Sequence, residues 1–194
     1  MVHTNKIEKA IRKATTLHHG QFRKNNNKLP YISHLFSVAS IASMYTKDED
    51  TIVSALLHDS IEDTFYKLSD LEKDFGKNVR NIVESLTEST KIQKYFRSRT
   101  KQKEIYYEKI SNGPKETAIV SAADKMHNMI SLIDDYDRLG NKLWKKFSAP
   151  PIKYLETFEK VINILEPKLP PQMAIEYKNI LHKLRLITKK SLQK

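Results

Sequence analysis

Apolar residues recur at intervals of three and four along most of this 194-residue chain. This spacing places them on one face of an α-helix, whereas a half-buried strand would alternate apolar and polar residues. No stretch of the sequence alternates well enough to predict a strand. The stretches whose spacing predicts a buried helical face are Ile7–Leu17, Leu35–Ala42, Val79–Leu86, Ala118–Met126 and Tyr154–Leu165. The pattern therefore predicts an all-α fold.

Glycine, proline and capping residues predict where some of these helices begin and end. Gly113-Pro114 is expected to end one helix and open the next. Ser69 and Glu72 have the spacing of a capping box, and Gly76 stands where that short helix would end. At the C-terminus we expect the basic tail, residues 189–194, to fray.

Composition limits the class of protein. No stretch rich in Gly, Pro or Ser divides the chain, so we expect a single domain over residues 1–194. The absence of cysteine excludes disulfides, thiolate zinc sites and cysteine nucleophiles. The N-terminus lacks the apolar core of a signal peptide, and no apolar run is long enough to span a bilayer. We therefore expect a cytoplasmic protein without a membrane partner.

The formal net charge of +11 would attract polyanions, although lysine-rich solvated helices explain such a charge equally often. The densest basic cluster is residues 91–103, where lysines and arginines surround Tyr95 and Phe96. Basic residues with interleaved aromatics can bind single strands through backbone contacts and stacking. No fold signature of a nucleic-acid-binding protein accompanies this segment, so we do not expect nucleic acid as a partner.

Candidate chemistry gathers in the stretch Leu56–Thr64, which reads LLHDSIEDT. If the stretch is one helix, Glu62 and Asp63 share a face with His58 and Asp59, because they follow three or four residues later. The apolar residues just before it would bury that face. Burying a histidine and three carboxylates is costly unless a divalent cation compensates them, so the stretch predicts a metal site.

Two further residues would complete the set of ligands. A lone histidine such as His34, in the first turn of a helix, is usually a surface or capping residue, but Asp124 lies among small and apolar residues where a carboxylate needs a partner. With His58 and Asp59 they make two imidazoles and two carboxylates, a mixed set suited to manganese, iron or zinc. We interpret His127 as a core residue and Tyr31 as a packing residue.

Four segments resemble the hydrolase domain of the RelA/SpoT homologues, which are HD-domain phosphohydrolases. They are His19–Lys24, Pro30–His34, Ala55–Thr64 and Ala123–Asn128. The chain lacks room for the synthetase and regulatory domains of the long enzymes, so it is similar to the stand-alone small alarmone hydrolases. The resemblance implies a single-domain HD-domain helical bundle.

The resemblance also implies an activity, namely removal of the 3′-diphosphate of guanosine tetra- or pentaphosphate to give GDP or GTP and pyrophosphate, with one manganese ion. In it, Glu62 and Asp63 match the acidic pair that positions or activates the attacking water. The matched metal ligands are His34, His58, Asp59 and Asp124. The residues expected to contact the substrate are Arg23, Lys24, Lys125, Asn128 and Ser131.

The sequence departs from the family pattern in the region of the substrate. Ser131 stands where the family often has threonine, and Lys125 replaces a frequent arginine; both changes are mild. Three consecutive asparagines, residues 25–27, lengthen the loop that follows Arg23 and Lys24. Residues 91–103 have no pattern that can be aligned with the family. These departures bear on base selectivity more than on the chemistry.

Two alternative functions stay open at the level of sequence. A related HD phosphohydrolase could act on NADPH or a nucleoside phosphate with the same metal, ligands and fold. A basic nucleic-acid-binding protein could carry a vestigial site, although every ligand and acidic position is still present. A second copy of the chain is a candidate partner, because the apolar C-terminal helices could pack on their own core or in a homo-oligomer.

Overall fold

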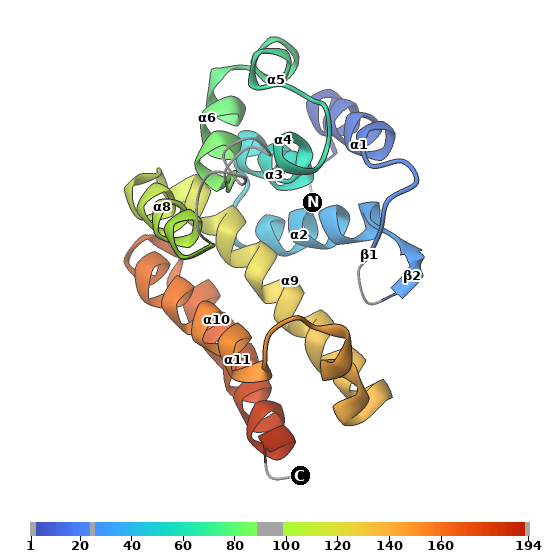
Figure 1. Cartoon of the computed structure of the whole chain (residues 1–194). Helices are drawn as coiled ribbons and strands as arrows, with labels where there is room; N and C mark the ends of the chain where they lie inside the picture. The colour runs from blue at the N-terminus through green and yellow to red at the C-terminus, as the bar shows by residue number, and fades with distance from the viewer. Residues whose placement is uncertain (1–2, 24–25, 89–98, 193–194) are drawn as a thin grey trace.

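The computed structural model describes residues 3–23, 26–88 and 99–192 (Figure 1). Lys24, predicted to contact the substrate, and most of the basic segment 91–103 lie outside the described residues. Nearly all of the described chain that has regular structure is helical, and its single sheet has two short strands. The prediction of an all-α helical bundle is therefore confirmed.

The two longest helices of the described chain, α9 and α11, both lie in its second half. The first half contains α1 (Asn5–Leu17), β1 (Phe22–Arg23), β2 (Asn26–Pro30), α2 (Ile32–Tyr45), α3 (Glu49–Leu57), α4 (Ser60–Asp63), α5 (Leu68–Phe75) and α6 (Lys77–Leu86). The second half contains α8 (Arg99–Asn112), α9 (Lys115–Leu139), the 3-10 helix η1 (Gly140–Lys146), α10 (Pro151–Leu165), the 3-10 helix η2 (Glu166–Lys168) and α11 (Pro171–Leu192).

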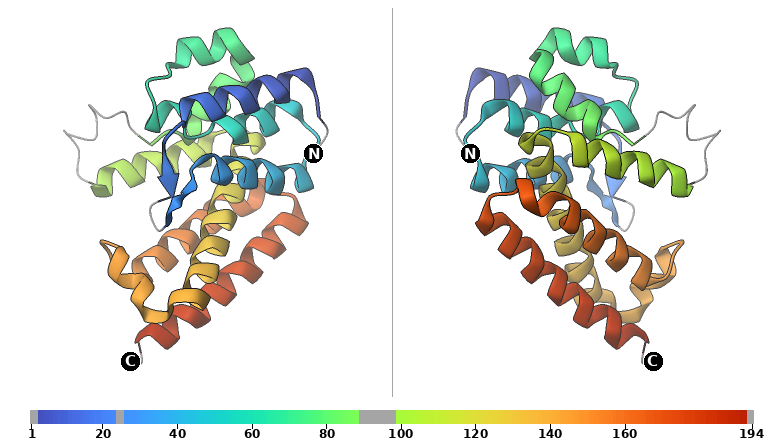
Figure 2. Two further views of the ribbon diagram at one scale, coloured as in Figure 1. Left: turned by 90° about the vertical axis from the view of Figure 1, so that its right-hand side faces the viewer. Right: turned by 90° about the vertical axis from the view of Figure 1, so that its left-hand side faces the viewer.

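Helix α9 is the centre of the fold and contacts both halves. Helices α2, α3 and α6 of the first half pack against it. Helices α10 and α11 of the second half also pack against it, and they pack on each other (Figures 1 and 2). Residues 117–124 of α9 are all buried, because they are small or apolar and have neighbouring helices on every side. Asp124 closes this run, and its carboxylate therefore lies in the interior.

The apolar stripes seen in the sequence form the core. The residues of α6 that recur at helical spacing are all buried, namely Val79, Ile82, Val83 and Leu86. Each such side chain removed from water stabilises the fold by about 1.5 to 3 kcal/mol before the entropy of ordering is counted. The predicted stripes of α2, α9 and α10 are also largely buried. Helical periodicity therefore identified the core correctly.

The hairpin of β1 and β2 was not predicted. Its strands are antiparallel, with Phe22 opposite Pro30, and at the open end of the hairpin the N–H of Tyr31 donates to the carbonyl of Gln21 at 2.8 Å. The apolar side chains of Phe22 and Leu29 are exposed, so no buried face imposes an alternating pattern on the sequence. The expectation that the chain has no strands is wrong in this detail.

The predicted capping box is also wrong. Helix α5 begins at Leu68, with Lys67 at the cap, and no described side chain forms a capping hydrogen bond there. Ser69 therefore lies inside the first turn. Gly76 does end α5 as predicted: its N–H donates to the carbonyl of Glu72 at 2.8 Å, and its φ of +92° is a conformation that favours glycine.

Helix boundaries in the second half agree better with the sequence. Gly113-Pro114 separates α8 from α9, as predicted.

The C-terminal helix α11 is held at its end by a side chain of η1, because Trp144 Nε1 donates to Ser191 Oγ at 2.9 Å. The tail expected to fray from residue 189 is helical as far as Leu192, and residues 193–194 lie outside the described part. Within that part, no helix has the length and apolar character needed to cross a membrane.

Candidate metal centre

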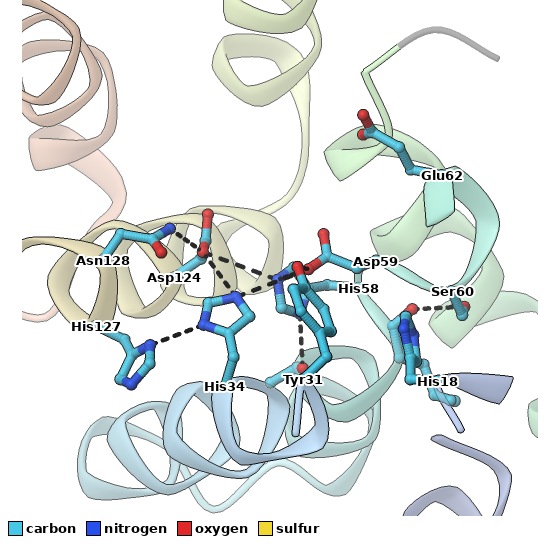
Figure 3. A network of polar contacts seen from close by, with 12 residues as sticks. His18, Tyr31, His34, His58, Asp59, Ser60, Glu62, Asp124, His127 and Asn128 are labelled. Atoms are coloured by element: carbon cyan, nitrogen blue, oxygen red, sulfur yellow. Dashed lines mark hydrogen bonds and ion pairs between the residues drawn. The ribbon is translucent and has the colours of Figure 1, made fainter. Parts of the chain in front are cut away.

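The four predicted ligands come together where α2, α3 and α9 pack on one another (Figure 3). One ligand atom from each of His34, His58 and Asp59 lies within 4.8 Å of the others. Asp124 Oδ1 lies 3.3 Å from His34 Nε2 and 3.9 Å from His58 Nε2. Both histidines and Asp124 are buried, and only 21% of the Asp59 side chain is exposed. The structure thus gathers the whole predicted set.

A break in the chain, rather than a continuous helix, presents His58 and Asp59. Helix α3 ends at Leu57 and α4 begins at Ser60, and Asp59 between them has φ −93° and ψ −3°, in the bridge region of backbone space. Ser60 Oγ donates to the carbonyl of Leu57 at 2.6 Å and fixes the bend. The stretch is therefore not one continuous helix, and the bend comes between the two ligands and the acidic pair along the chain.

His58 provides the test of whether the site fits a cation. Its Nδ1–H donates to the carbonyl of Ala55 at 2.9 Å, which leaves a lone pair on Nε2 in the neutral ring. Nε2 is buried, has no hydrogen-bond partner among the described residues, and lies 3.1 Å from Asp59 Oδ2 outside hydrogen-bond geometry. A lone pair and a carboxylate oxygen so placed repel each other unless a positive charge joins them. The donor set therefore fits a divalent cation.

The charges of the cluster shift the pKa values of its members. Burial disfavours the imidazolium of His58, but the carboxylates of Asp59 and Asp124 raise its pKa to about 9. Burial likewise disfavours the ionised form of Asp59, yet the attraction of His58 holds its pKa well below the usual range. Burial lowers the pKa of His34, which keeps that ring neutral. Without a metal, His58 is therefore protonated near neutral pH. A divalent cation would take the place of this proton, because ionised carboxylates and neutral imidazoles are the forms that bind metal ions.

Asp124 is held by residues that were predicted to contact the substrate. Lys125 Nζ donates to Oδ2 of Asp124 at 2.7 Å, and Asn128 Nδ2 donates to Oδ1 at 2.6 Å. Arg23 in turn donates to Asn128 Oδ1 at 2.9 Å. Burial opposes ionisation of Asp124, but the charge of Lys125 holds the pKa of the carboxyl well below its usual range. The basic and amide groups thus border the cluster on one side.

The remaining substrate candidate in the described chain is Ser131. It is half-buried and follows Asn128 by three residues on α9, so the two side chains lie on the same face of the helix. Contacts of Arg23, Lys125, Asn128 and Ser131 with a substrate stay predictions.

Glu62 stands apart from the ligands (Figure 3), whereas Asp63 is close enough to Tyr31 for its charge to help raise the pKa of that phenol. Glu62 Oε2 accepts the N–H of Glu88 at 3.3 Å, and Figure 3 shows the Glu62 carboxylate set apart from the four ligands. Asp63 is exposed, and its backbone carbonyl accepts Nε2 of Gln21 at 3.0 Å. The prediction that Glu62 shares the face of the ligands is wrong because the chain bends at Asp59. The role of the pair with water stays a prediction.

Two residues of the site were missed. Tyr31 donates its hydroxyl to Asp59 Oδ2 at 2.6 Å, and burial together with the charge of Asp59 raises the pKa of the phenol. His127 Nδ1 lies 2.7 Å from Nδ1 of His34. One signal was available: Tyr31 precedes His34 by three residues, which places it close to the ligand in the chain.

Comparisons with known proteins identify the family of the chain. The family model of the HD domain matches residues 10–149. The guanosine-3′,5′-bis(diphosphate) 3′-pyrophosphohydrolase MESH1 of Xenopus tropicalis is 37% identical over 128 residues, which cover 65% of this chain and 69% of that protein. A GTP pyrophosphokinase of Streptomyces coelicolor is 34% identical over 125 residues, 63% of this chain, but the match spans only 14% of that relative's length.

A solved structure has the same fold. It is described as that of a metazoan orthologue of SpoT that hydrolyses ppGpp, and it superposes with a TM-score of 0.76 over 94% of this chain and 97% of the other at 22% sequence identity. The chain therefore belongs to the HD-domain family and, within it, to the RelA/SpoT homologues.

Proposed function

We propose that this protein is a metal-dependent phosphohydrolase that removes the 3′-diphosphate of guanosine tetra- or pentaphosphate, giving GDP or GTP and pyrophosphate. The observation that carries the proposal is the buried cluster of two imidazoles and two carboxylates in which His58 Nε2 has no described hydrogen-bond partner. The names of relatives support the substrate, since the MESH1 proteins of Xenopus tropicalis and Drosophila melanogaster are called 3′-pyrophosphohydrolases of this nucleotide.

One divalent cation would be held by His34, His58, Asp59 and Asp124. The nitrogen and oxygen donors suit manganese, iron or zinc, and the resemblance to RelA/SpoT homologues favours manganese. When bound, such a cation acts as a Lewis acid toward a phosphoryl group and makes water a better nucleophile at neutral pH. Tyr31, as the neutral phenol, donates to Asp59 and keeps this carboxylate turned into the cluster.

The substrate would approach from the side of Arg23 and Asn128. The guanidinium of Arg23 lies over the ring of Tyr31, 5.6 Å from its centroid, and donates to Asn128. A guanidinium held in this way is suited to bind phosphate oxygens with two parallel hydrogen bonds. Arg23 would therefore fix the 3′-diphosphate beside the cluster, and Asn128 and Ser131 would lie next to the nucleoside.

The reaction balances with water as the only co-substrate. The water oxygen forms a bond to the phosphorus attached to the ribose 3′-oxygen, and the bond from that phosphorus to the 3′-oxygen breaks. Glu62, with Asp63 as its partner, would accept the proton that the water loses and pass it to solvent, and the 3′-oxygen would take up a proton from solvent and leave as a hydroxyl.

A product assay tests the proposal. Metal-stripped protein is incubated with guanosine tetraphosphate, with and without manganese, beside NADPH and common nucleoside phosphates, and products are separated by anion-exchange chromatography. We expect GDP and pyrophosphate only with metal and only when Asp59 is intact, with Asp59→Ala as the control. If another nucleotide is cleaved while the alarmone survives, the proposed substrate is wrong. If nothing is cleaved and nucleic acid binds regardless of Asp59, the vestigial-site alternative replaces it.

Two further proposals concern the whole protein. We propose a cytoplasmic location, which fractionation of the source cells would test. A homo-oligomer also stays a prediction: Ile175 and Leu186 leave apolar surface exposed on α11, where a second copy would pack. Light scattering of the purified protein would report its mass.

A further inference from the structure

His127 lies directly behind one of the candidate ligands. Its Nδ1 is 2.7 Å from Nδ1 of His34, and the two ring centroids are 4.9 Å apart with the planes tilted by 42°. Figure 3 shows the ring of His34 between His127 on one side and His58 and Asp59 on the other. The contact therefore engages the nitrogen of His34 that faces away from the cluster.

A hydrogen bond between two ring nitrogens holds one proton, so one ring must donate and the other accept. The opposite nitrogen of His34, Nε2, lies 3.3 Å from Asp124 Oδ1 and 3.7 Å from Asp59 Oδ2. If His34 donates from Nδ1, its neutral ring has a lone pair on Nε2 that points into the cluster. If His127 donates instead, His34 carries its proton on Nε2, where it excludes a cation. The direction of this one hydrogen bond decides whether His34 can be a ligand.

His58 shows how the same requirement is met elsewhere in the site. Its Nδ1–H donates to the carbonyl of Ala55, and a carbonyl can only accept, so the tautomer is fixed. No carbonyl is hydrogen-bonded to Nδ1 of His34 in the described chain, and α9 supplies the imidazole of His127 in its place. His127 follows Asp124 by three residues, so one face of α9 provides both a ligand and the partner of another ligand.

We infer that His127 is a positioning residue that accepts the Nδ1 proton of His34 and thereby presents the lone pair of His34 Nε2 to the cation. The inference rests on the proposed function, because it takes His34 as a metal ligand. It assigns His127 no contact with the substrate or the reacting atoms. Partners that orient a ligating histidine typically change metal affinity by about 10- to 100-fold when they are removed.

Calorimetric titration of manganese into the metal-free protein tests the inference without any substrate. His127→Leu should weaken binding by about 10- to 100-fold. His127→Asn, whose amide oxygen can accept in the place of Nδ1, should recover most of the affinity. His182→Leu removes an exposed histidine of α11 and should bind like the wild type. Wild-type affinity in His127→Leu, or an equal loss in His127→Leu and His182→Leu, would overturn the inference.

A second measurement uses the wild type alone, so it still tests the inference if His127→Leu does not fold. Nitrogen-15 NMR of the imidazoles in the metal-free wild type at neutral pH should find the proton of His34 on Nδ1 and none on Nδ1 of His127. A proton on His34 Nε2 would overturn the inference. Failure of the proposed function is distinguishable: if His127→Leu weakens manganese binding but the wild type hydrolyses no alarmone, the positioning role stands and the substrate does not.

Discussion

The candidate metal centre and the contact between α1 and α5 are both polar clusters, but only one of them is complete. Around Asp74, the hydroxyl of Tyr66 donates to Oδ2 at 2.7 Å and Lys13 Nζ lies 2.9 Å from the same oxygen. Lys9 donates to the carbonyl of Asp74 at 2.7 Å. Every charge in this cluster has an opposite charge or a hydrogen bond beside it.

The metal centre reaches such a balance only when His58 takes up a proton, because Asp59 and Asp124 raise the pKa of this buried ring to about 9. Two carboxylates, those of Asp59 and Asp124, meet two imidazoles in the interior, and His58 Nε2 has no described hydrogen-bond partner. Lys125 is the one permanent cation that contacts these carboxylates in the described structure. Burial makes such an arrangement costly unless a further positive charge enters. The comparison teaches that the polar groups around Asp74 pair with one another, whereas the metal centre has a ligand nitrogen, His58 Nε2, without a hydrogen-bond partner in the described chain.

The same substitution in both clusters gives the largest expected difference. Asp124→Asn keeps the shape of a ligand but removes its charge, and we expect alarmone hydrolysis to fall by roughly 1,000-fold, more than the 10- to 100-fold typical of an outer partner. Asp74→Asn, as the matched control, should leave the rate at the wild-type level. Steady-state assays with saturating manganese measure both. Equal activity of the two variants would break the comparison.

Lys125→Met should destabilise the metal-free protein by about 3 kcal/mol, because it leaves the buried carboxylate of Asp124 without its nearest cation. Manganese should restore part of that loss by supplying another positive charge. Urea unfolding with and without the metal measures both effects, and Lys125→Arg keeps the charge as a control. A metal-free Lys125→Met protein as stable as the wild type would show that Asp124 is compensated by other means.

Glu62→Gln should lower kcat by about 100-fold while manganese affinity stays unchanged, because Glu62 is assigned to proton transfer and stands apart from the ligands. Glu88→Gln is a suitable control, because the hydrogen bond from Glu88 to Glu62 comes from the backbone N–H, which the substitution leaves in place. Should Glu62→Gln weaken manganese binding instead, Glu62 would belong to the ligand set and the boundary of the metal centre would need to be redrawn.

The smallest effect is expected in the complete cluster. The hydrogen bonds from Tyr66 and Lys13 lower the pKa of Asp74 from 3.8 to about 2. A folded-state pKa below the unfolded value stabilises the protein above about pH 4, and this stabilisation is lost as the pH falls toward 2. Because the carboxylate is partly exposed and screened, we expect Asp74→Asn to cost about 1 kcal/mol.

Unfolding of the wild type and Asp74→Asn at a series of pH values checks this. The difference in the free energy of unfolding between the two proteins should be constant near neutral pH and should vanish in acid. A difference that grows as the pH falls would have the wrong sign for this carboxylate.

What the sequence revealed followed from local physics. Helical stripes such as that of α6 depend on spacing alone, and Asp124 was recognisable because a carboxylate stood among small apolar neighbours. The hairpin escaped because Phe22 and Leu29 are exposed. The bend at Asp59 escaped because periodicity carries no information on a single pair of backbone angles.

The partners of the ligands could not be found by spacing. His127 contacts His34 only because α9 packs on α2, and the two residues are 93 positions apart in the chain. Tyr31 was close enough in sequence to be considered, but its hydroxyl acts on Asp59, which lies on another element. Such pairs depend on the tertiary arrangement of helices, which a single sequence does not show.

The central claim, that the buried cluster is incomplete without a divalent cation, is tested most directly by unfolding the protein in urea with and without manganese. At a free metal concentration 100 times the dissociation constant, binding to the folded state alone stabilises a protein by about 2.7 kcal/mol. We predict this gain for the wild type and for Asp74→Asn, and none for Asp59→Asn at the same concentration. A wild type that gains nothing, or an Asp59→Asn variant that gains as much as the wild type, would contradict the account.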